Sequence, residues 1–569
     1  PSQPVRYRDY LRTWIDQADT TPNADVPPTL RGVSMKQFES KELVGTKFYD
    51  PCPIDRLDPP TFPTAQVTAH KPTKITHILK PWAIRHLARK LKPIIAVMKL
   101  QRDGKPVPES LMAQCSTIVI GQDGFVDAAR GVVWDLRSRH PDGHFLPLAF
   151  DEPITSHLDT DAMFTALGDD YPDQSLRHQV KHGALFFASL ELQIVVCPHL
   201  VSLGDAFQVA ERDLFRLARL GYLEVVESEH FSLDDDSELI MAFGLLPIRC
   251  TSQGTRARKL QPEKPRRIAN GGGPHKKLVD GLKRPVVPLN VAINFRSVVD
   301  GVRKFPRETK PLAPGVMTDI AILQTPARIL HVPVLQFNDD SSDAFNQLML
   351  HRSQIWMTSV LWLKINSVAS RCEYGHILEN SFGFGYSCAS GFCQRFGVAM
   401  MWLVTRAMRQ AELPIRSTVT DPSLLEWFRQ RDALGDNESD LFRCHIFTDD
   451  PQFMAVGFDR LVRLICCWRD VTVMIGLRMA IAAKRQCGTS ILWTGLRYHG
   501  AIGAVVIPPQ KRSRAISELV RMKKGEMFRV DDAMSIAGLL EHLTPFANEL
   551  RSAMYHFYYP HKAFWALGM

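Results

Sequence analysis

Two stretches of this sequence place carboxylates where a strand ends or a tight turn forms. The apolar run Val334–Phe337 is typical of a β-strand, and Asp340 follows it closely. Much later in the chain, Asp449 and Asp450 lie between two apolar runs, a pattern typical of a β-hairpin turn. Adjacent acidic residues alone indicate only a solvated turn. Other acidic pairs and triplets occur at 169–170, 234–236 and 531–532.

Together, these carboxylates predict a site for two divalent cations. A strand end with one aspartate, beside a hairpin with two, can bring hard oxygen ligands to one place. Such ligands suit Mg²⁺ better than thiols or imidazoles do. Two such ions support nucleotidyl transfer: one lowers the pKa of the attacking hydroxyl, and the other holds the triphosphate and its leaving pyrophosphate. We expect Asp340, Asp449 and Asp450 to bind two Mg²⁺ ions, with Mn²⁺ as an alternative.

The composition is that of a globular protein with a modest basic excess. The chain has 569 residues, 45% of them hydrophobic and 23% charged, with a net charge of +9. Ten lysines and arginines lie in the segment Thr251–Arg284, against only Glu263 and Asp280. Cations clustered this densely repel one another unless a polyanion neutralises them, which favours a fingers-like hairpin that grips phosphates. A solvated basic loop is the alternative.

Cysteine usage and hydropathy point to an intracellular protein. The 11 cysteines are scattered and form no Cys-x-x-Cys motif, which indicates reduced thiols and no zinc site. No apolar run reaches the ~18 residues that a membrane span needs. The first residues do not have the apolar core of a signal peptide. We expect a cytoplasmic or nuclear location and no membrane partner.

Three motifs, in order, resemble the palm of a reverse transcriptase. They are Asp-Ser-Ser-Asp-Ala-Phe at 340–345, Phe-Gly-Phe-Gly-Tyr-Ser-Cys-Ala-Ser-Gly-Phe-Cys-Gln-Arg-Phe at 382–396, and Phe-Thr-Asp-Asp at 447–450. The middle motif is similar to the family's Pro-Phe-Gly-Leu-Lys-Asn-Ala-Pro-x-x-Phe-Gln-Arg-Phe. Gly383 and Ser390 stand in place of its prolines.

Further segments extend the resemblance in both directions. The segment 460–485 is similar to the family's palm helix and following lysine, here Lys484, and the segment around Trp493 is similar to its primer grip. Upstream, 265–272 resembles a fingers strand, although Pro265 and Asn270 replace the usual aromatic residue and aspartate. The C-terminal segments 514–525 and 537–559 resemble thumb helices, in the style of tyrosine-recombinase (DIRS-like) and related protist retroelements.

The resemblance implies a role for each matching residue. Phe345 would be the steric gate that excludes a ribose 2′-hydroxyl, and Lys484 would donate a proton to the departing pyrophosphate. Arg266, with Lys264 or Lys259, would clamp the incoming triphosphate. Further contacts to the nucleotide are expected from Ser341, Asp343, Ala344, Phe384 and Gly385, and the primer grip from Trp493, Thr494 and Gly495.

The resemblance also implies an α+β right-hand polymerase, with fingers, a ferredoxin-like palm and a helical thumb behind an N-terminal extension. The expected divisions are a Pro-rich segment at 1–75, a domain of unknown function at 76–173, helices and fingers at 174–333, the palm at 334–507 and the thumb at 508–569.

The expected activity is DNA synthesis from deoxynucleoside triphosphates with a DNA primer, on an RNA template and also on a DNA template. Other domains of a retroelement polyprotein are further expected partners. Two alternatives remain open. An RNA-dependent RNA polymerase has the same palm, usually with Gly-Asp-Asp and no aromatic gate. A catalytically retired, RNA-binding reverse-transcriptase scaffold tends to lose the acidic residues that are present here.

Overall fold

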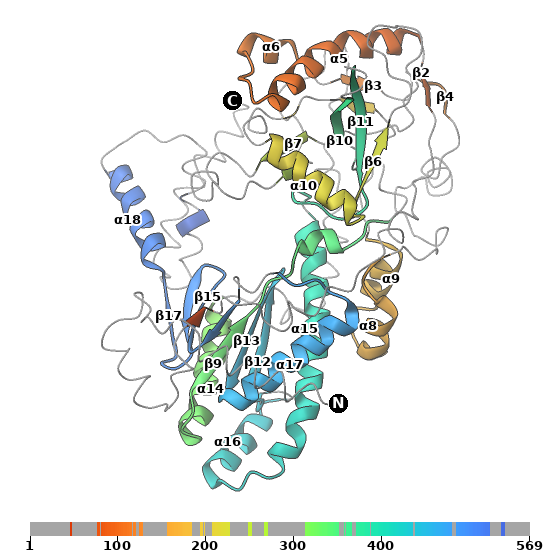
Figure 1. Ribbon diagram of the computed structural model, residues 1–569. Coiled ribbons are helices and arrows are strands. Elements are labelled where there is room, and N and C mark those ends of the chain that lie inside the picture. The colour runs from red at the N-terminus through yellow and green to blue at the C-terminus, as the bar shows by residue number, and fades with distance from the viewer. Residues whose placement is uncertain are drawn as a thin grey trace.

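A five-stranded antiparallel sheet forms the centre of the computed structural model (Figure 1). The structure describes residues 81–115, 156–184, 207–227, 313–351, 371–386, 388–435, 438–480 and 485–523, with short pieces at 46–47, 77–79, 118–120, 125–128, 194–196, 199, 249–252, 267–270, 358, 360–366, 536 and 538–540. In spatial order, the strands of the central sheet are β1 (Thr46–Lys47), β14 (Gln486–Gly488), β9 (Val334–Asn338), β13 (Asp450–Val456) and β12 (Phe442–Phe447).

Two helices connect these strands in a simple order. Along the chain, β9 is followed by α15 (Ala389–Arg416), the hairpin β12–β13, α17 (Phe458–Ile475) and then β14. In the sheet, β14 and β13 flank β9, and β12 lies outside β13. This is the strand–helix–strand–strand–helix–strand order of a ferredoxin-like unit, into which further elements are inserted.

A separate hydrophobic core covers each face of the central sheet. Leu335 and Phe337 of β9 pack with α15 and α17, while Val334 belongs to the core on the opposite face. This second core includes residues of α14 (Ala313–Ile329) and α16 (Pro422–Asp432). All positions of β9 are buried, because successive side chains point to opposite faces and both faces are covered.

A second, smaller sheet packs beside the central one. Its strands are β15 (Ser490–Trp493), β16 (Leu496–His499) and β17 (Ala504–Val506), and α18 (Pro509–Lys523) follows. The backbone at Gly500 approaches β9 so closely that a Cβ there would lie 2.4 Å from the carbonyl oxygen of Val334. Glycine is therefore required where this sheet crosses the central one.

The remaining elements gather largely above the central sheet in the view of Figure 1. One antiparallel sheet has the order β10-β11-β6, and β2 pairs with β4, β3 with β5, and β7 with β8. The bounds are β2 (His77–Leu79), α5 (Pro81–Arg102), α6 (Glu109–Gln114), β3 (Ile118–Ile120), β4 (Phe125–Ala128), α8 (Thr160–Leu167), α9 (Gln174–His182), β5 (Ile194–Val196), α10 (Phe207–Arg219), β6 (Leu223–Glu227), β7 (Arg249–Ser252), β8 (Arg267–Asn270), the short 3₁₀ helix η5 (Ala344–Gln347), β10 (Val360–Asn366) and β11 (Arg371–Glu379).

Parts of the N-terminal extension contact the central unit. The backbone N–H of Asp159, just before α8, donates to the carbonyl of Ile475 at the end of α17, across 2.7 Å. Asp173, which caps α9, forms an ion pair with Arg395 of α15 at 2.7 Å, and both side chains are buried. Strand β1 also pairs with β14. Contacts therefore cross the expected boundary at 173/174. Nearly all of 1–75 lies outside the described residues.

Two helices occur where the sequence led us to expect them. Most of α17 lies in the segment 460–485 that resembles the palm helix, and a helix, α18, occupies part of the segment expected to form the thumb. Across the described ranges, no helix is long and apolar enough to cross a membrane. The described cysteines are free thiols, and Cys388 and Cys393 are buried.

Candidate active site

The register of the central sheet places Asp340 directly opposite Asp450. The pairing of β9 with β13 ends at Asn338 and Gln452, but backbone hydrogen bonds continue it. The N–H of Asp339 donates to the carbonyl of Pro451, and the N–H of Ser341 to that of Asp449, each across 3.3 Å. Directly opposed residues of an antiparallel pair direct their side chains to the same face. The predicted strand-end and hairpin carboxylates therefore come from adjacent strands at the same end of one sheet.

The hairpin between β12 and β13 turns through Thr448 and Asp449. Phe447 pairs with Asp450, which leaves two residues in the turn. Thr448 has a φ of 62°, in the left-handed region that primed hairpin turns require but that a β-branched residue rarely adopts. Neighbouring contacts must hold this conformation in place, because it costs of order 1–3 kcal/mol.

Helix α15 supplies those contacts. The side-chain oxygen of Gln394 accepts the N–H of Thr448 at 2.7 Å, and its amide nitrogen donates to the carbonyl of Ile446 at 3.1 Å. The thiol of Cys393 donates to the Thr448 carbonyl at 3.6 Å. A Cβ at Gly397 would lie 2.7 Å from the Ile446 side chain, so a glycine lets the helix approach this closely. The sequence places Gln394 in the motif at 382–396, but nothing in it indicates that this side chain clamps the hairpin.

Phe345 and Phe384, two predicted nucleotide contacts, lie against each other. Their ring centroids are 5.0 Å apart at an interplanar angle of 85°, an edge-to-face arrangement. Both rings are half-buried, and Ala344 beside Phe345 is buried. Gly385 is exposed and has a φ of 114°, which other residues rarely adopt. The structure therefore brings the residues of two distant motifs together.

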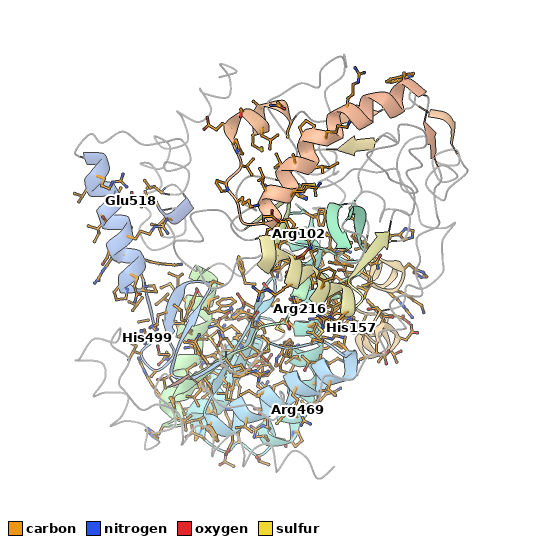
Figure 2. The ribbon with its side chains drawn as sticks, turned by 45° about the horizontal axis from the view of Figure 1, so that its top comes forward. Arg102, His157, Arg216, Arg469, His499 and Glu518 are labelled. Carbon is orange, nitrogen blue, oxygen red and sulfur yellow. The ribbon has the colours of Figure 1, made fainter. Side chains whose placement is uncertain are left out.

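Asp343, another predicted nucleotide contact, is bound by Arg216 of α10. The guanidinium donates to both carboxylate oxygens, at 2.6 and 2.9 Å, and also to Asp213 at 2.8 Å. These hydrogen bonds, with that to Asp343 foremost, raise the pKa of Arg216 above its ordinary value. Figure 2 shows Arg216 and His157 where the upper elements meet the central part of the molecule. Nothing in the sequence indicated Arg216, because a basic residue in the last turn of a helix is ordinary.

The segment after α17 pairs with the loop that contains Asp340. The N–H of Ala480 donates to the carbonyl of Asp340 at 2.7 Å, and that of Ser342 to the carbonyl of Arg478 at 3.0 Å. Gln347 strengthens this contact, because its amide nitrogen donates to the Arg478 carbonyl at 2.9 Å and its oxygen accepts the Arg478 N–H at 2.8 Å. Lys484, the predicted proton donor, lies outside the described residues.

The predicted primer grip reaches the hairpin directly. Thr494 and Gly495 form the turn between β15 and β16, with φ values of 47° and 79°. Trp493 is buried, and its indole N–H donates to the carbonyl of Asp450 at 3.0 Å. A residue predicted from a separate motif therefore contacts the acidic doublet.

Lys264 and Arg266 are the residues predicted to bind the incoming triphosphate. Both lie outside the described residues, as do most positions of the basic segment. The strand β8 begins at Arg267 and pairs with β7, which ends near the start of the basic segment. Its relation to the three aspartates stays a prediction.

The three aspartates fit a hard cation by their donor chemistry. Each is half-buried, and each offers carboxylate oxygens, the ligands that Mg²⁺ prefers. Among the residues that the structure describes, no group of three or more His, Cys, Asp or Glu side chains is arranged to hold a metal ion. The two-ion site therefore stays a prediction, supported by the sheet register and the donor types.

Comparison with known proteins gives structural neighbours only. No family model and no curated protein matches the chain. A foamy virus protease–reverse transcriptase in complex with double-stranded DNA is similar with a TM-score of 0.31 and 10% identity, over 60% of this chain and 41% of that one. Apo telomerase from Candida tropicalis, truncated from its C-terminal domain, is similar with a TM-score of 0.31 and 10% identity, over 53% and 60%.

A third neighbour is telomerase from Candida albicans with a fragment of telomeric RNA. Its TM-score is 0.25 and its identity 11%, over 62% of this chain and 67% of that one. The chain spans less than two thirds of the first two neighbours. These scores and identities describe a weak likeness in fold and no more.

Proposed function

We propose that this chain is a template-directed DNA polymerase of the reverse-transcriptase kind. It would extend a DNA primer on an RNA template with deoxynucleoside triphosphates. The proposal rests on the order of the sequence motifs and on the geometry of the site.

The observation that carries the proposal is the opposition of Asp340 and Asp450 across β9 and β13. The two residues are far apart in the chain, yet they occupy matching register positions, with Asp449 in the adjoining turn. Like charges brought this close repel one another, and bound cations would offset the repulsion. If Asp449 and Asp450 belonged only to a solvated turn, there would be no physical reason for the neighbouring strand β9 to lead to a carboxylate, Asp340, at the same end of the sheet.

In this proposal, Asp340, Asp449 and Asp450 would hold two Mg²⁺ ions. When bound, such ions lower the pKa of the primer hydroxyl and stabilise the charge on the leaving pyrophosphate. Phe345 would border the sugar, supported from the side by Phe384, and thereby exclude a 2′-hydroxyl. Lys484 would donate a proton to the pyrophosphate.

The larger elements then take the roles of a right-hand polymerase. The ferredoxin-like unit would be the palm, and the hairpin β15–β16 would be the primer grip, because Trp493 contacts Asp450. The hairpin β7–β8 would belong to the fingers, with Lys264 and Arg266 binding the triphosphate. Helix α18, with its many basic residues, would belong to a thumb that contacts the nucleic-acid backbone.

Primer extension on an RNA template tests the proposal. The purified chain is supplied with a DNA primer and either deoxy- or ribonucleotides in Mg²⁺. We expect deoxynucleotide extension by the wild type and none by Asp449→Asn. The control is Asp169→Asn with Asp170→Asn, an exposed acidic pair away from the sheet end, which should leave extension unchanged. Preferred use of ribonucleotides would favour the RNA polymerase alternative, and RNA binding without extension would favour the scaffold alternative.

A further inference from the structure

The side chain of Asp339, the residue before Asp340, lies on the face of the central sheet that α15 and α17 cover. Its carboxylate accepts the indole N–H of Trp468 in α17 at 3.1 Å. Trp468 also packs against Phe453 of β13, on the face covered by α15 and α17. Because side chains alternate along a strand, Asp340 faces the other way. The two adjacent acids therefore occupy different environments, although the sequence shows only a doublet.

Arg485 neutralises this buried carboxylate. Its Nε donates to Asp339 at 2.7 Å, and both side chains are completely buried. Packing alone does not call for such a pair, because apolar residues of similar volume are often equally stable or more stable in its place. The pair joins the residue that follows β9 to the residue that precedes β14.

The same carboxylate oxygen also holds the backbone of Asp340. Oδ1 of Asp339 accepts the N–H of Asp340 at 3.0 Å, while the carbonyl of Asp340 accepts the N–H of Ala480 at 2.7 Å. The peptide groups on both sides of the Asp340 Cα are thus fixed. An asparagine at 339 would offer only its single carbonyl oxygen to three donors.

The link continues from Arg485 toward the primer grip. The next residue, Gln486, donates its N–H to the side-chain oxygen of Asn338 at 2.9 Å. Its side chain bonds the backbone of Leu492 in both directions, at 2.8 and 3.1 Å. Leu492 precedes Trp493, which contacts Asp450. Arg485 therefore bonds to Asp339, the residue before Asp340. The chain that follows Arg485 forms β14 and β15, and β15 ends at Trp493, which contacts Asp450.

We propose that the Asp339–Arg485 pair is a positioning device for the cation ligand Asp340. It rests on the proposed function, because that function supplies the cation. Asp339 would touch neither the cation nor the substrate, because its carboxylate is bonded to Trp468 and Arg485 on the other face of the sheet. It acts by holding the Asp340 backbone at the register position opposite Asp450, as groups behind a metal ligand commonly orient it.

The test measures cation binding without catalysis. Mn²⁺ binding to the full chain is followed by electron paramagnetic resonance of the free ion, and thermal unfolding is measured on the same samples. The variants are Asp339→Asn, the double variant Asp339→Leu with Arg485→Leu, and Asp449→Asn. The control is Glu412→Gln, because Glu412 accepts from Arg460 and Arg463 at 2.7 Å, beside the opposite end of β13.

We expect Asp339→Asn to weaken Mn²⁺ binding by about 10- to 100-fold, the usual loss when a group that orients a ligand is removed. The double leucine variant should regain thermal stability relative to Asp339→Asn, because no buried charge is left unpaired, but it should not regain Mn²⁺ affinity. Glu412→Gln should lower the unfolding temperature and leave Mn²⁺ affinity unchanged.

The possible outcomes separate this inference from the proposed function. Mn²⁺ binding that needs Asp449 but is unaffected by Asp339→Asn would overturn the inference alone. A double leucine variant that regains both thermal stability and Mn²⁺ affinity would also overturn the inference alone. Mn²⁺ binding that does not need Asp449 would overturn both the inference and the metal site of the proposed function. Mn²⁺ binding that needs Asp449 and is weakened by Asp339→Asn, without primer extension, would overturn only the polymerase assignment and would support the inference.

Discussion

The indole N–H of Trp493 donates a hydrogen bond to the backbone carbonyl of Asp450, across 3.0 Å. The contact joins the last residue of β15 in one hairpin to the acidic doublet of another, and the tryptophan side chain is buried. A backbone contact of this kind sets where the Asp450 Cα lies without occupying its carboxylate. The hairpin β15–β16 therefore supports the site as well as the proposed primer end.

Replacing Trp493 by phenylalanine keeps most of the packing and removes the donor. We expect the primer-extension rate to fall by roughly 2- to 12-fold, which corresponds to the free energy of one hydrogen bond. Single-turnover extension measures this effect. Trp427→Phe is the control, because Trp427 is buried in α16 away from the doublet, and its variant should extend primers at the wild-type rate.

Removing the clamp of α15 on the hairpin should affect both stability and activity. In Gln394→Ala, the N–H of Thr448 and the carbonyl of Ile446 each lose a partner. We expect the free energy of unfolding to fall by about 1–3 kcal/mol, together with a loss of extension rate. Urea unfolding and primer extension measure the two effects. The exposed Gln430→Ala should change neither, and a Gln394→Ala variant of wild-type stability would show that the clamp contributes nothing.

Truncating Phe345 to valine should relax sugar selection. A ribose 2′-hydroxyl would need the volume of the ring, and overlap in a packed site is costly. We expect the ratio of ribo- to deoxynucleotide incorporation to rise by about 10- to 100-fold, with deoxynucleotide use falling only modestly. Single-nucleotide extension with each sugar gives the ratio. Phe458→Val, at a partly buried ring packed on the core, should leave it unchanged. An unaltered ratio in Phe345→Val would mean that Phe345 serves packing only.

Stability should depend on pH through His157. The pKa of His157 is lowered from 6.5 to about 4. Burial is the largest cause of this shift, and the hydrogen bond to Gln347 opposes it. The unfolded state therefore binds more protons than the folded state between these values, so stability is lost as the pH falls from 6.5 toward 4. The loss should approach roughly 3 kcal/mol.

Urea unfolding between pH 7 and pH 4.5 measures this dependence. His157→Gln should flatten it, because glutamine does not titrate and can still bond Gln347. His331→Asn, at an exposed histidine, should keep the wild-type slope. An equal slope in His157→Gln would assign the pH dependence to other groups.

The locally encoded parts of the site could be predicted from the sequence. The run that becomes β9 and the turn before Asp450 follow from hydrophobic spacing and turn chemistry. The helix that Gly476 caps was expected from the family resemblance. The meeting of Asp340 with Asp450 required the resemblance or the cation argument as well, because strand pairing is not a local property.

The partners of Asp343 and Asp339 could not be predicted. Arg216 lies 127 positions before Asp343, and Arg485 lies 146 positions after Asp339. Such pairs depend on which elements become neighbours, and arginine is too common to mark a partner. The opposite orientations of Asp339 and Asp340 could not be predicted from the sequence either, because two adjacent acidic residues do not show which face of a strand each side chain occupies.

The central position of β9 has a consequence for how the chain folds. Its two neighbours in the sheet come from much later in the sequence: Gln336 bonds Gln452 across 116 positions, and Asn338 bonds Gln486 across 148. At the usual speeds of protein synthesis, β9 would wait on the order of ten seconds on the ribosome before both neighbours have been made. Contacts of such long range also slow folding, because large loops must close first. We therefore expect the strand next to Asp340 to be exposed during synthesis, and a chaperone that binds short apolar segments to act on it before the sheet is complete.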